Sequence, residues 1–349
     1  MSIPQFYLHE RKRGGGMIQP TTTDGVLTAM IAARGAAIAN LKKCNEDIED
    51  SCLLQKLNQM IVAVSEVAVV DKAMQEDADK GLVPFFVVAT LGTPSVFSCD
   101  HLAEIGPVCC RYCAWLHVDA SYGGAAFLCP EFRPLMSGIE YSSSFTTSPH
   151  QWLLTHHDCS ILYVKEKKKF LKSLTIDHPY LKLKKIDEDF NNWTIPLTRR
   201  FRSIKLWFVM RDNGIEGLQA YIWNHCLLAK CFEELINKDT RFKVVYEVWF
   251  GIVCFRLCGS DELNKNLLKS INSSQEIFLT STTAKGQYII QFSVSYQCAT
   301  EEDICTAWKI IQKHATKVLQ GDDTCTKKPT TKPPPEKQNS KQLCTTHKN

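Results

Sequence analysis

Apolar residues follow two different patterns along this chain, and each pattern predicts a different kind of element. Residues 26–41 are rich in Ala, Leu and Ile at helical spacing, and residues 53–74 form a second apolar region that favours a helix. Residues 83–91 instead form an almost continuous apolar run, which is typical of a strand buried on both faces. Further strands are predicted at 115–118, 143–147 and 161–164, and a further helix at 101–109. This alternation predicts an α/β layer fold.

The pattern changes after Arg202. Helical spacing at 203–211 and 214–236 is followed by predicted strands at 242–257, 277–280 and 288–294 and by a closing helix at 301–319. We therefore expect a large domain over residues 1–203 and a small α+β domain over 204–320. Residues 321–349 are dominated by Lys, Thr and Pro, so this tail is predicted to be disordered.

The segment before the first helix is rich in glycine and threonine. Gly14, Gly15 and Gly16 allow tight or left-handed turns, so residues 14–19 are interpreted as a loop. Thr21, Thr22 and Thr23 come next, at the expected start of the helix. Their hydroxyls and the free backbone N–H groups can hold a phosphate, or they can simply cap the helix.

Composition and charge narrow the classes of partner. Hydrophobic residues make up 44% of the chain and charged residues 22%, as in ordinary globular proteins. The net charge is only +4, and most of it lies in the lysine-rich tail. The body is nearly neutral, so we predict neither a nucleic-acid partner nor a membrane partner. No apolar run is long enough to span a bilayer and the N-terminus lacks a signal-peptide pattern, so a cytoplasmic location is expected.

The sixteen cysteines do not point to a metal site. Cys110 and Cys113 form a C-x-x-C pair, but zinc needs two more ligands and no second pair has matching spacing. Residues 156–159 are His, His, Asp and Cys, which are ligands by type only. No metal is predicted.

Asp119 is the first candidate for chemistry. It stands where a predicted buried strand meets a turn of small residues, which includes Ser121. Ligands of open α/β sheets bind beyond the carboxyl ends of the strands, where a carboxylate can hold a protonated ring nitrogen. The alternative is an aspartate that caps the following turn.

Longer stretches carry a resemblance. Trp-Leu-His-Val-Asp-Ala at 115–120 and Ser-Pro-His-Gln-Trp-Leu-Leu at 148–154 resemble motifs of the group II pyridoxal-phosphate decarboxylases, most closely the aromatic-L-amino-acid and histidine decarboxylases. Further similar stretches are 81–86, 88–93, 127–133, 195–203, 217–222 and 253–257. The resemblance covers roughly residues 3–319. It implies the type I, aspartate aminotransferase-like fold, with a truncated large domain built on a mixed, mainly parallel sheet and a C-terminal α+β domain.

The resemblance also implies a cofactor, pyridoxal 5'-phosphate, and roles for particular residues. Asp119 matches the acid that pairs with the pyridine nitrogen. Tyr180 matches a mobile-loop tyrosine that protonates the substrate carbon after carbon dioxide leaves. The remaining candidates for the cofactor site are Thr21, Thr22, Thr23, Ser121, Ser148 and His150; Thr21 and Thr23 stand at phosphate-binding serines, and Ser148 and His150 match residues that line the phosphate and the Schiff-base lysine.

The chain departs from the family pattern where the chemistry is most demanding. Gln151 occupies the position of the Schiff-base lysine, and an amide cannot form that bond. Pro94 replaces a threonine, and Asn191 replaces an arginine. The segment between Val62 and Asp71 is shortened, the family's Ser-x-x-x-x-His segment has no counterpart, and the family's N-terminal domain is expected to be missing.

Four hypotheses follow for the function. The first is a decarboxylase-family member, converting an amino acid to an amine and carbon dioxide, that is impaired by Gln151 and binds its cofactor weakly and without a covalent bond. The second is a non-catalytic partner or regulator of a full-length decarboxylase, as a heterodimer or a homodimer. The third is a residual decarboxylase of aromatic amino acids. The fourth is a chain of low stability, because the shortened segment removes a strand from a parallel sheet.

Overall fold

The structure is a computed structural model that describes residues 4–7, 13–44, 61–62, 67–174, 193–196 and 198–321. Tyr180, Asn191 and residues 322–349 lie outside this part, so the predictions made for them are not tested.

One six-stranded sheet organises the N-terminal half. The strand order is β1-β6-β5-β4-β3-β2; β2 to β5 pair in parallel, while β6 runs antiparallel to β5 and β1 antiparallel to β6. The mixed, mainly parallel sheet that the resemblance implied is thus confirmed. The strands are β1 (Gly15–Gln19), β2 (Ile61–Val62), β3 (Phe86–Thr90), β4 (Trp115–Asp119), β5 (Ser144–Thr147) and β6 (Ser160–Val164).

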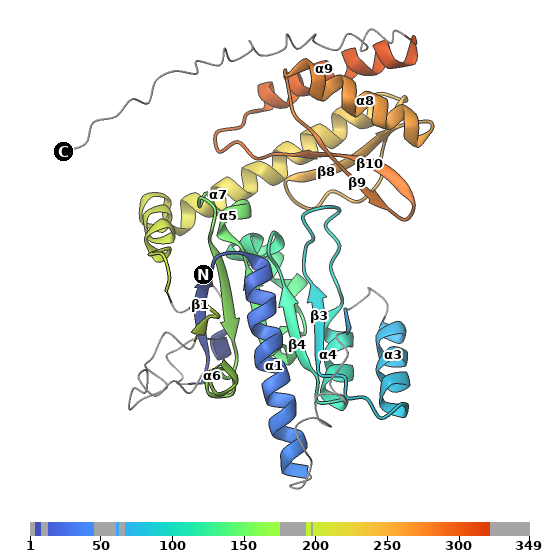
Figure 1. Ribbon diagram of the computed structural model, residues 1–349. Coiled ribbons are helices and arrows are strands. Elements are labelled where there is room, and N and C mark those ends of the chain that lie inside the picture. The colour runs from blue at the N-terminus through green and yellow to red at the C-terminus, as the bar shows by residue number, and fades with distance from the viewer. Residues whose placement is uncertain are drawn as a thin grey trace, which may run out of the picture.

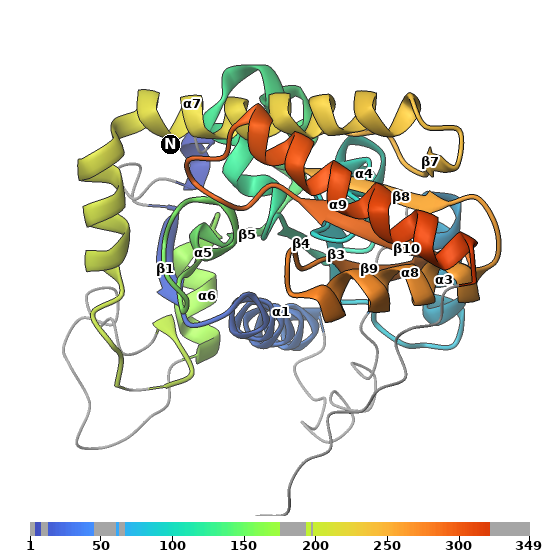
Figure 2. The same ribbon diagram turned by 90° about the horizontal axis from the view of Figure 1, so that it is seen from above.

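Helices cover both faces of this sheet, which explains why residues on both faces of β4 and β5 are buried. Leu116 and Val118 pack toward α4 (Leu102–Arg111), and Trp115, pointing the other way, packs toward α1 (Thr22–Cys44). Figure 2 shows α1 end-on on one side of the strands and α4 on the other. The remaining helices here are η1 (Gln5–Tyr7), α3 (Val67–Asp79), η3 (Gly123–Leu128), η4 (Pro130–Met136), η5 (Ile139–Tyr141), α5 (Pro149–Trp152) and α6 (Lys167–Leu174).

Two predictions near the N-terminus are corrected. Residues 15–19 form strand β1 instead of a loop. Their glycines serve close packing: a Cβ on Gly15 would lie 2.3 Å from the Trp193 ring, and one on Gly16 would lie 3.0 Å from the Tyr163 ring. The helix expected over 53–74 is replaced, in the described residues, by the short strand β2 and by α3, which begins only at Val67.

The C-terminal half forms a second unit on a four-stranded antiparallel sheet, as the α+β prediction requires. Phe232 of the long helix α7 stacks on Phe292 at 3.9 Å and meets Phe255 and Trp308 edge-on. The two helices predicted at 203–211 and 214–236 are one element, kinked at Gly214, where φ is 65°. The elements are α7 (Ser203–Asn237), β7 (Phe242–Val244), β8 (Ile252–Leu257), α8 (Asp261–Ser274), β9 (Thr280–Ala284), β10 (Gln287–Ser293) and α9 (Glu301–Leu319).

The second unit lies over the carboxyl ends of the parallel strands (Figure 1). The loop after β3 bridges the two units: the Phe97 ring lies 4.2 Å from the Phe250 ring, and Cys254 Sγ donates a hydrogen bond to the Ser95 carbonyl at 3.2 Å. The strand ends therefore lie beneath the second unit.

No helix among the described residues is long and apolar enough to cross a bilayer.

We predict opposite effects for two glycine substitutions. Gly138 has φ of 91°, and a Cβ there would lie 2.2 Å from the Ala103 backbone nitrogen, so Gly138→Ala should lower the free energy of unfolding by about 2 kcal/mol or more. Gly217 lies inside α7 with its nearest neighbour at 3.5 Å, so Gly217→Ala should raise it by up to about 1 kcal/mol. Urea unfolding measures both. Equal effects of the two substitutions would contradict the close contact at Gly138.

Candidate functional site

The ends of β4 and β5 are held together by backbone hydrogen bonds that continue past the strands. The Ala120 amide donates to the Thr146 carbonyl at 2.9 Å, and the Ser148 amide donates to the Ser121 carbonyl at 3.0 Å. The turn after Asp119 and the turn carrying Ser148 thus lie side by side at the carboxyl edge of the sheet. The decarboxylase-like motif at 115–120 ends at this edge, and the one at 148–154 begins there.

Asp119 points to the face of the sheet that α1 covers. Side chains alternate along a strand, so Asp119 shares this face with Trp115 and His117, and Trp115 packs in the cluster with α1. Asp119 Oδ1 accepts hydrogen bonds from the Ser121 amide, at 2.9 Å, and from the Ser121 hydroxyl. Burial raises the pKa of Asp119, and the Ser121 bonds oppose that rise. In the described part of the chain no cation contributes to this balance, so the carboxylate is suited to a cationic ligand atom.

Three hydroxyl groups meet at the first turn of α1, on the same face. Thr22 Oγ1 lies 2.7 Å from Ser148 Oγ, which lies 2.6 Å from Ser160 Oγ. Ser148 and Ser160 are buried, and the helix adds free N–H groups and the positive end of its dipole. Hydroxyls and amides at a helix N-terminus are the usual partners of a phosphate group.

The three consecutive threonines have different positions. Thr21 caps α1: its hydroxyl donates to Asp24 Oδ2 at 2.7 Å and accepts from the Asp24 amide at 3.1 Å. Thr22 joins the hydroxyl cluster, and Thr23 is exposed. Ser160 was not predicted, because nothing in the sequence distinguishes it from any polar residue at the start of a strand. It reaches the cluster only because β6 folds back beside β5.

Gln151 lies on α5, directly after the hydroxyl cluster. The backbone amide of Gln151 donates to the Ser148 carbonyl at 2.9 Å, and the residue is exposed. His150 precedes it, and its Nδ1 donates a hydrogen bond to the Cys159 carbonyl at 2.7 Å. The His150 and His157 rings are 4.5 Å apart. The structure therefore brings Thr22, Ser121, Ser148, His150 and Gln151 into the turns around Asp119, whereas Tyr180 lies outside the described residues.

A buried histidine, His117, links β4 to β5 on the same face of the sheet as Asp119. His117 Nδ1 lies 2.7 Å from Ser144 Oγ, and His117 Nε2 lies 3.3 Å from Thr146 Oγ1. Trp115 Nε1 donates to the same Ser144 hydroxyl at 2.8 Å. These bonds join β4 to β5 two residues before Asp119. Burial lowers the pKa of His117 to about 3, so the ring is neutral at physiological pH.

The side chains fit one kind of group and not another. The hydroxyl cluster and the Asp119 carboxylate fit a phosphate at one end and a protonated ring nitrogen at the other. Among the described residues, no three His, Cys, Asp or Glu side chains gather as metal ligands. Asp158, a metal candidate by residue type, instead lies 3.7 Å from Arg200 and 3.9 Å from Arg202.

Comparisons with known proteins show the family. The pyridoxal-dependent decarboxylase conserved domain matches residues 61–258. The chain belongs to this family. Aromatic-L-amino-acid decarboxylase of Bos taurus is 38% identical over 93% of this chain and 73% of its own length. Histidine decarboxylase of Homo sapiens is 38% identical over 94% of this chain and 54% of its own length.

Solved structures of plant enzymes share the fold. Oryza sativa TDC with PLP and tryptamine superposes with a TM-score of 0.83 and 32% identity, over 91% of this chain and 73% of that one. Catharanthus roseus tryptophan decarboxylase with L-tryptophan gives a TM-score of 0.79 and 34% identity, over the same shares, 91% and 73%. The type I fold and a family built on pyridoxal phosphate, both expected from the motifs, are confirmed.

The buried histidine makes the stability of this decarboxylase-family fold depend on pH. The pKa of His117 is about 3 in the folded chain and 6.5 in the unfolded chain, where the ring is not buried. Below pH 6.5 the unfolded chain therefore binds a proton that the folded chain does not bind. The contribution of His117 to the free energy of unfolding should be fully present above pH 6.5. Below pH 6.5 it should fall by up to about 1.4 kcal/mol per pH unit.

His117→Gln should make the urea-unfolding free energy less dependent on pH between about 6.5 and 5, since glutamine does not titrate there. The exposed His101 provides the control, and His101→Gln should keep the native slope. If both variants keep that slope, His117 does not control it.

Proposed function

We propose that this chain is a catalytically impaired member of the amino-acid decarboxylase family that binds pyridoxal phosphate without a covalent bond. The observation that carries the proposal is the combination of side chains suited to the cofactor, Asp119 and the hydroxyl cluster, with Gln151 on the neighbouring turn. The domain division at residues 203 and 320 belongs to the same proposal, with the cofactor held mainly by the first domain.

Three groups of side chains support cofactor binding. The hydroxyls of Thr22, Ser148 and Ser160 receive the phosphate at the start of α1. Asp119 pairs with the ring nitrogen, and a cation there relieves the cost of its burial. When bound, pyridoxal phosphate supplies the electron sink that decarboxylation of an amino acid needs. Ser121 holds the Asp119 carboxylate in place.

Gln151 supports the loss of activity. A carboxamide nitrogen is not nucleophilic, so it can neither hold the cofactor covalently nor displace an amine product. His150 keeps its place next to Gln151, with its Nδ1 bonded to the Cys159 carbonyl. The chain therefore retains groups that bind and orient, and lacks the group that couples substrate and cofactor.

Restoring the lysine tests the impairment. Carbon dioxide release from aromatic amino acids and histidine is measured for the native chain and for Gln151→Lys, both with added pyridoxal phosphate. The native chain should show no release above that of free cofactor, and Gln151→Lys should exceed it by at least about tenfold, which is about 1.4 kcal/mol of barrier. The exposed Gln287→Lys is the matched control and should stay inactive. Substantial release by the native chain would refute the impairment.

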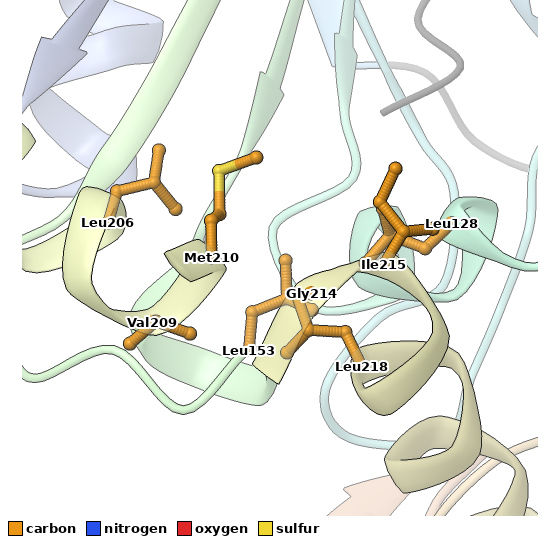
Figure 3. Close-up of a pocket in the computed structure, with 8 residues that line it drawn as sticks. All are labelled: Leu128, Leu153, Leu206, Val209, Met210, Gly214, Ile215 and Leu218. Atoms are coloured by element: carbon orange, nitrogen blue, oxygen red, sulfur yellow. The ribbon is translucent and has the colours of Figure 1, made fainter. Parts of the chain in front are cut away.

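A second candidate function is that of a partner for a longer decarboxylase, or for a second copy of this chain. The first half of α7 exposes large apolar side chains, with Trp207 58% and Phe208 59% exposed. A small apolar cavity of about 30 Å³ opens at the Gly214 kink (Figure 3), lined by Leu128, Leu153, Leu206, Val209, Met210, Gly214, Ile215 and Leu218. Contiguous exposed apolar surface of this kind marks protein interfaces.

Co-purification with a tagged aromatic-L-amino-acid decarboxylase tests this candidate, and analytical ultracentrifugation of the chain alone reports self-association. A charge placed on the apolar surface should disrupt either complex, so Phe208→Glu should reduce complex formation at least about tenfold. Phe278, which is 78% exposed between α8 and β9, gives the control Phe278→Glu, which should have no effect. Absence of any complex with the native chain would exclude the partner function.

A further inference from the structure

A large cleft lies at the end of the first sheet that is opposite to Asp119. It has a volume of about 660 Å³ and opens between the last turns of α1 and the helix α6. Trp115, the first residue of β4, lines it, whereas Asp119 is the last residue of the same strand. Figure 1 shows α1 running from the covered edge of the sheet to this opposite end. Along α1, Thr22 and Lys43 are about 30 Å apart at 1.5 Å per residue, so the cleft is not part of the candidate cofactor site.

The wall of this cleft is strongly cationic. Among the residues that the structure describes, the lining holds one carboxylate, that of Glu166, and five lysines: Lys43, Lys165, Lys168, Lys169 and Lys172. Glu166 is already neutralised, because Lys169 lies 2.8 Å from it and Arg13 lies 3.3 Å from it. The other lysines repel one another across the opening, and a bound anion would relieve that repulsion.

One of these lysines directs its ammonium to groups that do not line the cleft. Lys165 donates a hydrogen bond to the Glu140 carbonyl and lies 5.1 Å from the centre of the Phe6 ring. Lys168 and Lys172 are one helical turn apart on α6, so their side chains lie on the same face. Lys43 comes from α1, on the other side of the opening. The cations therefore surround the opening from two helices.

The floor of the cleft is apolar and exists because of small residues on α1. A Cβ on Gly35 would lie 2.4 Å from Ser173 Oγ, so glycine allows α1 and α6 to touch at this turn. Next to this contact, alanines at 33, 36, 37 and 39 leave space that larger side chains would fill. The rings of Phe85 and Trp115, both in the core beneath α1, close the floor.

We propose that this cleft binds a small organic phosphate with a flat aromatic body. Its volume lies within the range of small-molecule sites, its cations suit a phosphate, and its floor suits an apolar ring. The ligand would place its phosphates between Lys43 and Lys168, Lys172, and its ring over Ala36 and Trp115. This site is separate in position and in residues from the hydroxyl cluster at Thr22.

Equilibrium dialysis with metal-free adenosine triphosphate tests the proposal on the full chain, because this probe has both parts and no aldehyde. The native chain should bind it, and Lys168→Gln/Lys172→Gln should weaken binding at least about tenfold through loss of two ion pairs. Lys269→Gln/Lys285→Gln removes the same charge from exposed positions on the other unit and should leave affinity unchanged. Equal weakening by both double variants would overturn the proposal, since it would mean binding to diffuse positive charge.

Two further measurements test whether the apolar floor contributes to binding and whether the cleft is separate from the hydroxyl cluster. Inorganic tripolyphosphate should bind more weakly than adenosine triphosphate, and Ala39→Leu, which fills the cleft with a good helix former, should weaken only the nucleotide. Ser148→Ala should leave nucleotide affinity unchanged, since Ser148 is at the other end of the sheet. Equal affinity for the two anions, or loss of binding in Ser148→Ala, would contradict a separate site with an aromatic floor. Melting curves confirm that each variant is folded.

Discussion

The parallel pairing of β4 with β5 is the constraint on which the site depends. It sets Asp119 opposite Thr146, and the backbone bonds that continue past the strands bring the Ser121 and Ser148 turns together. Because a shift by one residue would turn Asp119 to the opposite face, this register decides whether carboxylate and hydroxyls can serve one ligand. His117 reinforces the register by bonding to two side chains of β5.

The side chains that suit cofactor binding and the side chain proposed to stand at the lysine position depend on different parts of the fold. Binding of a phosphate and a ring nitrogen depends on backbone register, on the start of α1 and on a buried carboxylate, all of which the fold itself maintains. The covalent bond depends on a single exposed side chain, at Gln151, whose identity contributes little to packing. The proposed loss of this amine would therefore cost little folding energy, and it is compatible with the sheets and packed cores of the fold.

Most of the fold and part of the site could be predicted from the sequence. The apolar runs at 83–91 and 115–118 predicted the buried strands, and the motifs around Asp119 and Gln151 predicted the family. Strand β1 was missed because its glycines indicate turns, and only the contacts with Trp193 and Tyr163 explain them. Ser160 was missed because its role follows from antiparallel pairing across the sheet. The cleft between α1 and α6 was missed because these two helices are more than a hundred residues apart in sequence.

Reduction with borohydride tests the central claim most directly. The native chain and Gln151→Lys are mixed with pyridoxal phosphate, reduced and digested, and mass spectrometry locates the attached cofactor. The account predicts a stoichiometric attachment at position 151 in the variant and none at any single lysine in the native chain. Stoichiometric attachment to one native lysine, such as Lys205 near His157, would show that another amine has taken over and would contradict the account. Failure of the variant to retain cofactor would contradict cofactor binding by Asp119 and the hydroxyl cluster.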